Sequence, residues 1–159
     1  LFALDNLWDG IGGLIATDPT VKYLSGKVTI YSTSPEMSRK AMVYYLDMSF
    51  GDREGLITSK NPETCTPEQA AFFKELFTGA DYKENYAILN NYVKSLGDSI
   101  PPFIHLYIGL SPTMKTFGTT FDPDFGDCYD TAMIITTDDI YPDKYKRYVE
   151  SYEKCKVRE

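Results

Sequence analysis

The sequence predicts an α/β (α+β) domain in which a mixed sheet of about three strands is flanked by helices. Apolar residues recur at helical spacing in 4–17, whereas they alternate with polar residues in 26–32. Residues 114–121 and 130–137 carry the β-branched and aromatic content of two further strands. A chain of 159 residues fits one domain, so we expect these elements to share a single core.

The first helix is expected at residues 4–17, and it contains three glycines within four positions, Gly10, Gly12 and Gly13. Each glycine weakens a helix by up to about 1 kcal/mol relative to alanine. Such a cost indicates that this helix packs closely against a neighbour or lies near a ligand, and we favour the packing interpretation. Pro19 ends the helix.

A strand and a second helix follow. In the strand at 26–32, Val28 and Ile30 share one face. The run Thr33-Ser34-Pro35-Glu36 has the pattern of a capping box with proline in the first turn, so the next helix is predicted to start there. Gly51 closes that helix.

An αα-hairpin insertion is expected at about 66–96. Thr66-Pro67-Glu68-Gln69 is a second capping-box pattern, and Gly79 ends the helix that it opens. A further helix at 82–96 has one apolar face and ends before Gly97. The insertion separates the first strand from the later ones.

The last third of the chain returns to strands. Residues 103–110 favour a short helix, and Gly118 marks a bulge or a close approach in the strand that follows. The aspartate-rich loop 122–129 connects the last two strands, and a tail helix is expected to start near Pro142.

Composition excludes several classes of function. Hydrophobic residues make up 43% of the chain and charged residues 25%, and the net charge is −7, which argues against a nucleic-acid partner. No apolar run approaches the roughly 20 residues that cross a bilayer. Cys65, Cys128 and Cys155 are an odd number of cysteines without CxxC spacing, which indicates free thiols and a cytoplasmic location.

Basic residues are enriched only at the tail, where a solvated helix face is the main interpretation. An acidic acyl carrier or an anionic lipid surface is the alternative, which would make the protein membrane-peripheral. The enrichment consists of Lys144, Lys146, Arg147, Lys154, Lys156 and Arg158.

A series of short motifs in fixed order resembles the C-terminal half of a GCN5-related N-acyltransferase. Within that superfamily, the chain resembles the hemolysin-like and ornithine-lipid-synthase-like branch. The motifs are Leu7-Trp8-x-Gly10-Ile11, Tyr23-Leu24-x-Gly26-x-Val28, Ser38-Arg39, Ile100-Pro101-Pro102-x4-Tyr107, Gly118, Asp122-x2-Phe125 and Asp130.

The resemblance implies a reaction. Members of this bacterial branch transfer a 3-hydroxyacyl chain from an acyl carrier protein to the amine of an amino acid such as ornithine or glycine, in aminolipid synthesis. We therefore expect acyl carrier protein or a CoA thioester as donor, a small amino acid as acceptor, and no bound cofactor or metal.

The chain departs from the family pattern at the donor site. The superfamily binds the donor diphosphate on backbone N–H groups of a glycine-rich turn that opens a helix, and no such turn follows a strand in this chain. The strand and loop expected before Leu1 are absent. We therefore expect a truncated acyltransferase domain that is inactive alone.

Candidate catalytic residues lie in the loop between the last two strands. A carboxylate there can bind the substrate ammonium or accept its proton. Asp122 and Asp130 match family positions, whereas turn formation explains Asp124 and Asp127. The spacing lacks the residues of a calcium loop.

Other candidates support binding and proton transfer. Ser32 and Ser34 follow the first strand and can donate hydrogen bonds to a substrate, although helix capping also explains Ser34. Tyr107 can protonate the leaving thiolate, as a tyrosine does in related enzymes, or satisfy a buried carbonyl. His105, the single histidine, is interpreted as a packed or surface residue, which disfavours a Cys–His nucleophile.

A second hypothesis is a non-catalytic module that binds a partner or forms a homodimer. Without upstream strands, one strand edge and an apolar helix face would be exposed, and such surfaces invite pairing.

Overall fold

The structure, a computed structural model, describes residues 2–152, with side chains described from Asn6 onward. The chain divides into two compact units. The first comprises residues 1–25, 106–114 and 134–159, and the second comprises 26–105 and 115–133. Cys155 and the basic residues Lys154, Lys156 and Arg158 lie outside the described residues.

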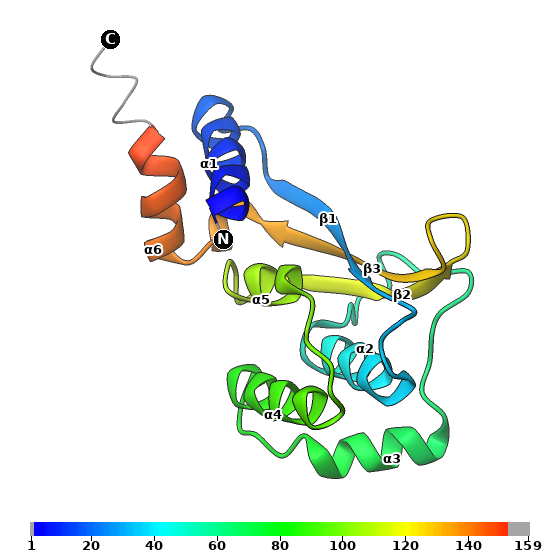
Figure 1. Cartoon of the computed structure of the whole chain (residues 1–159). Coiled ribbons are helices and arrows are strands. Elements are labelled where there is room, and N and C mark those ends of the chain that lie inside the picture. Colours follow the sequence, from blue (N-terminus) through cyan, green and yellow to red (C-terminus); the bar gives the residue numbers. More distant parts are fainter. Residues whose placement is uncertain (1, 153–159) are drawn as a thin grey trace. The chain divides into compact units, whose positions relative to one another are not determined.

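A three-stranded antiparallel sheet runs through the structure in the order β1–β3–β2 (Figure 1). Its strands are β1 (Tyr23–Ile30), β2 (Lys115–Asp122) and β3 (Cys128–Thr136). Within the described residues, parallel pairing is confined to an isolated bridge between Gly51 and Thr116. The predicted α/β class with a sheet of about three strands is confirmed.

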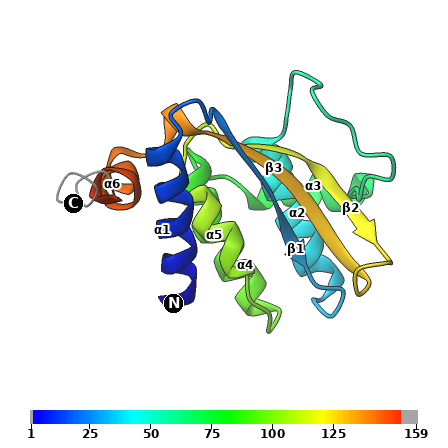
Figure 2. The same ribbon diagram turned by 90° about the horizontal axis from the view of Figure 1, so that it is seen from above.

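Three helices lie on one face of the sheet in the second unit (Figures 1 and 2). The helix α2 (Glu36–Phe50) packs against β2, and both α3 (Pro67–Leu76) and α4 (Tyr82–Ser95) pack against α2. The predicted αα-hairpin insertion is therefore confirmed. The core of the second unit is aromatic and aliphatic. Its fully buried side chains include Ile30, Met42, Tyr45, Leu46, Phe73, Leu89 and Val93.

The two predicted capping boxes have different outcomes. At α3, the Thr66 side chain accepts a hydrogen bond from the Gln69 backbone N–H and the Gln69 side chain accepts one from the Thr66 N–H, as predicted. The box predicted at Thr33–Glu36 is wrong. Ser34 is held in a turn by its N–H, which donates to the Tyr31 carbonyl, and Pro35 occupies the N-cap without a side-chain hydrogen bond.

In the first unit, α1 (Phe2–Thr17) packs against the chain's C-terminal helix. That helix begins as α6 (Pro142–Tyr145), as predicted, but continues as the π-helical segment η2 (Lys146–Glu150). A Cβ built on Gly12 would lie 2.1 Å from the Tyr148 carbonyl oxygen, so this glycine permits the close packing that the sequence indicated. The core here includes Trp8, Ile15, Leu110, Ile140 and Val149.

Two short elements complete the fold, namely α5 (Pro102–Ile108) and the 3-10 turn η1 (Thr137–Asp139). The short helix expected at 103–110 is thus confirmed. Gly118 adopts φ +81°, a left-handed conformation that fits the predicted bulge in β2. None of the described helices is both long and apolar enough to cross a bilayer.

Candidate functional site

Asp130 is tied to the neighbouring strand by two hydrogen bonds. Its Oδ1 accepts from the Thr29 hydroxyl at 2.6 Å, and its Oδ2 accepts from the Lys27 ammonium at 2.5 Å. Lys27 and Thr29 lie on the same face of β1, two residues apart, as strand geometry requires. The Asp130 side chain is only 13% exposed, so β1 and β3 hold a carboxylate and an ammonium in fixed contact.

Electrostatics strengthen this contact. The hydrogen bond to Asp130 raises the pKa of Lys27, with further contributions from the charges of Asp130 and Asp122. The Lys27 ammonium also lies 4.3 Å from the ring centroid of Phe125, a cation–π distance. The β2–β3 hairpin therefore surrounds the Lys27 ammonium with the negative charges of Asp130 and Asp122 and the ring of Phe125.

Cys128 lies buried beside this pair. Its thiol donates to the Phe125 carbonyl at 3.0 Å, and its sulfur is 3.9 Å from Asp130 Oδ1. Burial, followed by the negative charges of Asp130 and Asp122, raises the pKa of Cys128. Because the thiolate is the nucleophilic form, this environment does not suit a cysteine nucleophile.

Asp122 takes part in turn formation. Its Oδ1 accepts the backbone N–H of Asp124 at 3.1 Å, an interaction that starts the loop between β2 and β3. Asp127 has φ +50°, a conformation that aspartate tolerates better than most residues. The local role expected for Asp127 agrees with this geometry, and Asp122 shows a similar one.

A second polar cluster lies at the start of α2. The Arg39 guanidinium stacks 4.2 Å from the Tyr129 ring centroid and donates to the Ser34 carbonyl at 3.3 Å. Glu63 Oε1 lies 2.6 Å from Lys40 Nζ and 3.9 Å from Arg39 Nε. All three charged side chains are largely buried, and the Arg39 Nε is without a hydrogen-bond partner.

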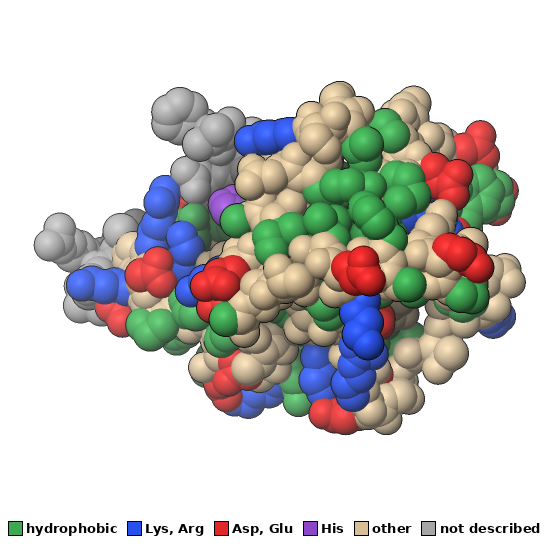
Figure 3. Space-filling model, turned by 90° about the horizontal axis from the view of Figure 1, so that it is seen from below, with side chains coloured by type: hydrophobic (Ala, Val, Ile, Leu, Met, Phe, Trp, Pro, Cys, Tyr) green, Lys and Arg blue, Asp and Glu red, His purple; other side chains and the backbone are tan. Residues whose placement is uncertain are grey.

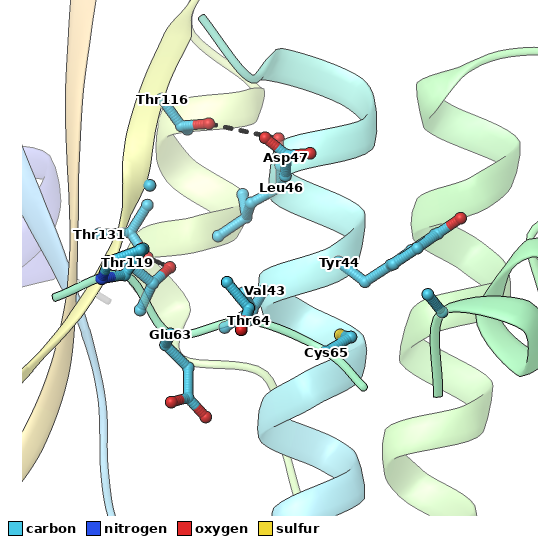
Figure 4. Close-up of a pocket in the computed structure, with 13 residues that line it drawn as sticks. Val43, Tyr44, Leu46, Asp47, Glu63, Thr64, Cys65, Thr116, Thr119 and Thr131 are labelled. Atoms are coloured by element: carbon cyan, nitrogen blue, oxygen red, sulfur yellow. Dashed lines mark hydrogen bonds between the residues drawn. The ribbon is translucent and has the colours of Figure 1, made fainter. Parts of the chain in front are cut away.

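A cavity of about 360 Å³ lies within the second unit, between α2, β2 and the segment 62–65 (Figure 4). Val43 and Leu46 point from α2 toward the sheet, whereas Tyr44 points away from it (Figure 4). Thr116, Thr119 and Thr131 form the sheet side of the wall. Such a volume is within the range of small-molecule sites, about 300–1,000 Å³.

The remaining predicted site residues are more scattered. Ser32 is exposed in the turn after β1, and Ser34 contributes its carbonyl to Arg39. Tyr107 belongs to the first unit, where its ring meets Trp8 edge-on at 5.7 Å, and burial raises the pKa of its phenol. His105 is exposed, with its ring 5.5 Å from that of Tyr86.

The sequence did not single out Lys27, Thr29, Lys40 or Glu63 as site residues. Alternation along β1 shows that Lys27 and Thr29 share a face, but only the register between β1 and β3 shows that this face meets Asp130. Glu63 lies in an irregular segment, where no periodicity predicts its partners.

An antiparallel three-stranded sheet with helices on it is consistent with the fold of GCN5-related N-acyltransferases. The chain is 42% identical over 154 residues to a protein named glycine N(alpha)-acyltransferase from Phocaeicola vulgatus. It is 43% identical over 155 residues to a protein of the same name from Bacteroides thetaiotaomicron. These relatives support an acyltransferase family for the chain.

The matches cover nearly all of this chain but only part of each relative. They include 97% and 96% of the chain, and 47% and 45% of the respective relatives. The chain therefore spans about half the length of the curated relatives it matches. No family model matches the chain, and no solved structure gives a significant match.

Proposed function

We propose that this chain is part of an N-acyltransferase that transfers a fatty acyl or 3-hydroxyacyl group from acyl carrier protein or CoA to an amino-acid amine. The observation that carries the proposal is the 42% identity, over 97% of the chain, to a protein named glycine N(alpha)-acyltransferase. The same name favours glycine over ornithine as the acceptor. The product would be an aminolipid, as in the hemolysin-like branch that the sequence resembles.

The reaction requires that an amine nitrogen forms a bond to the acyl carbonyl carbon while the carbon–sulfur bond of the thioester breaks. The attacking ammonium must first lose a proton, and the departing sulfur takes the electron pair and then a proton. Asp130 already holds an ammonium group, that of Lys27, at 2.5 Å. We assign Asp130 to binding the ammonium of the acceptor, which would displace the ammonium of Lys27. Asp122 adds a second negative charge near this position.

The other predicted residues receive complementary roles. Tyr107 keeps its proton at neutral pH, since burial raises its pKa, and a protonated phenol can supply the proton that the leaving thiolate needs. Ser32 is exposed and available to a substrate, whereas Ser34 acts through its carbonyl on Arg39.

Expression of the full-length gene, followed by mass spectrometry of extracted lipids, tests the proposal. We expect N-acylglycine lipids that are absent from the empty-vector control. The absence of any new amine-linked lipid, with folded protein present, would refute it. The isolated chain should show no turnover with acyl carrier protein or CoA thioesters, and measurable turnover by this piece would contradict the expected incompleteness of its donor site.

A binding or dimerisation module is the second candidate. In the described sheet β1 is an edge strand, with β3 on one side and no described strand on the other. Hydrophobic side chains also gather on the second unit's surface seen from below (Figure 3). Exposed apolar residues on the helices of this unit include Met48 and Phe72, and Leu96 follows α4 directly. Edges and patches of this kind favour association.

Light scattering of the isolated chain separates these candidates. A dimer or larger species at high concentration supports the module, and a monomeric mass contradicts it. The gene sequence upstream of Leu1 gives independent information, because a strand followed by an anion-binding turn there favours the enzyme.

A further inference from the structure

We propose that the cavity between α2, β2 and the segment 62–65 binds the unbranched alkyl chain of an acyl group. The inference rests on the proposed acyl-transfer function, because that function says which molecule supplies the alkyl chain. The cavity lies entirely within the second unit and has a volume of about 360 Å³. Its occupant is deduced from the chemistry of its walls.

The polar groups on the sheet side of the cavity already have protein partners. The Thr116 hydroxyl donates to the Leu46 carbonyl at 3.3 Å, and the hydroxyls of Thr119 and Thr131 pair at 2.7 Å. With their oxygens engaged, these threonines offer a guest their methyl groups. Opposite them, Val43 and Leu46 supply aliphatic surface from α2. The threonine hydroxyl protons are used within the protein, so these side chains offer a guest few donors, whereas an aliphatic guest disturbs no hydrogen bond.

Charges at the cavity are likewise paired. Glu63 is 2.6 Å from the Lys40 ammonium, and Asp47 is 3.5 Å from Arg53. Because each carboxylate already has a cation, the cavity has little to attract a charged amine. The Asp47 and Arg53 side chains are exposed, so the polar head of an amphipathic molecule can stay hydrated beside them.

The edge of β2 leaves a point of access. At one end of this edge, Gly51 forms a β-bridge with Thr116 and the Asp52 N–H donates to the Thr116 carbonyl. At the other end, Pro62 forms a β-bridge with Thr120 and the Glu63 N–H donates to the Thr119 carbonyl, so both ends are covered. Gly118 lies between these attachments, lines the cavity and is exposed. A Cβ built there would meet only the Ser59 Cβ, at 3.9 Å. An alkyl chain can therefore enter the cavity from solvent beside Gly118.

Cys65 provides a reporter for occupancy. It lines the cavity and is half-buried, whereas Cys128 lies outside the lining and is buried. Alkylation by iodoacetamide, followed by mass spectrometry of the cysteine peptides, measures each thiol separately. The probes are hexanoate, octanoate, decanoate and dodecanoate below their micellar concentrations, added to the full 159-residue chain.

We expect longer fatty acids to slow the alkylation of Cys65 at least tenfold at saturation, without slowing that of Cys128. Apparent affinity should rise roughly fourfold per added methylene until the cavity is full. An unchanged Cys65 rate with every probe, or equal slowing of both thiols, would overturn the proposal and leave the cavity as a packing defect.

Neighbouring alanines on α3 offer a matched pair of variants. Ala70 lines the cavity, whereas Ala71 is exposed and outside the lining. Ala70→Phe should abolish protection of Cys65, and Ala71→Phe should retain it. If circular dichroism shows that Ala70→Phe does not fold, Ala70→Leu replaces it. Protection that persists in a folded Ala70 variant contradicts the assigned location.

Further arms of the experiment distinguish the sources of the alkyl chain and separate the two proposals. Protection by S-acyl-pantetheine, N-acylglycine or free fatty acid is compared at equal chain length. In the full-length protein, Ala70→Phe should shift the N-acylglycine products toward short chains. N-acylation without protection of Cys65 overturns the alkyl site alone, whereas protection without N-acylation by the full-length protein overturns the proposed enzyme alone.

Discussion

Gly12 is the position where a single added carbon should do most damage in the first unit. In Gly12→Ala, the new Cβ would lie 2.1 Å from the Tyr148 carbonyl oxygen and 2.6 Å from its carbonyl carbon, well below the 3.0 Å limit that real Cβ contacts respect. Both atoms belong to the backbone of η2, so no side-chain rotation relieves the clash. The helices α1 and η2 must therefore move apart.

The magnitude follows from two opposing terms. Overpacking costs about 1–3 kcal/mol, and the severity of this contact places it near the upper end. Replacing glycine by alanine inside a helix returns about 1 kcal/mol. The net loss should be about 2 kcal/mol, which lowers Tm by roughly 4–8 °C in a chain of this size.

Gly10→Ala is the matched control, because a Cβ there meets nothing within 4 Å. It should gain up to about 1 kcal/mol from helix propensity alone. Urea unfolding followed by fluorescence of Trp8, the single tryptophan, reports on this helix. The two variants should differ by about 3 kcal/mol. Equal stabilities would show that α1 and η2 are not packed as described.

Three further predictions concern the second unit. Thr66→Ala should destabilise the fold by about 1 kcal/mol in urea unfolding, because it removes a side-chain cap, whereas Ser34→Ala should change stability by less than about 0.5 kcal/mol. The folded-state pKa of Lys27 is raised, so its stabilising contribution is complete below the ordinary value of 10.5 and is lost as pH rises through the folded pKa; Lys27→Met should flatten the alkaline pH dependence of unfolding, and an unchanged profile would contradict the ion pair. In the full-length protein, Asp130→Asn should lower N-acylation by about a hundredfold or more, whereas Asp124→Asn in the exposed turn should retain it; equal activities would remove Asp130 from the site.

Local signals made much of the fold predictable. Thr66 and Gln69 are three residues apart, so their reciprocal hydrogen bonds could be inferred from the sequence alone. Gly97, with φ +75°, ends the insertion where a glycine after an apolar stripe predicts an end. The Thr33–Glu36 prediction failed because Ser34 belongs to a competing turn, in which its N–H donates to the Tyr31 carbonyl. The N-cap of α2 is therefore Pro35, which has no side-chain hydroxyl.

The site was much less predictable, because its contacts join distant segments. Lys27 and Asp130 are 103 positions apart in the sequence. The register of the antiparallel strands that brings them together cannot be inferred from the sequence of either strand alone. The cavity depends on how α2 packs on β2 and on where the irregular segment at Glu63 attaches to Thr119. No short-range pattern in the sequence specifies either arrangement.

The aspartates of the hairpin differ in what their carboxylates contact, and this difference separates a turn residue from a site residue. Asp122 accepts from a backbone N–H two positions away, an interaction that the loop needs in order to form. Asp130 is not required by the loop, since its partners Lys27 and Thr29 lie on another strand. Lys27 is about half exposed, so solvent screens its pairing with Asp130 and the ammonium can be displaced. A largely buried carboxylate that holds an exchangeable ammonium is suited to binding a substrate amine.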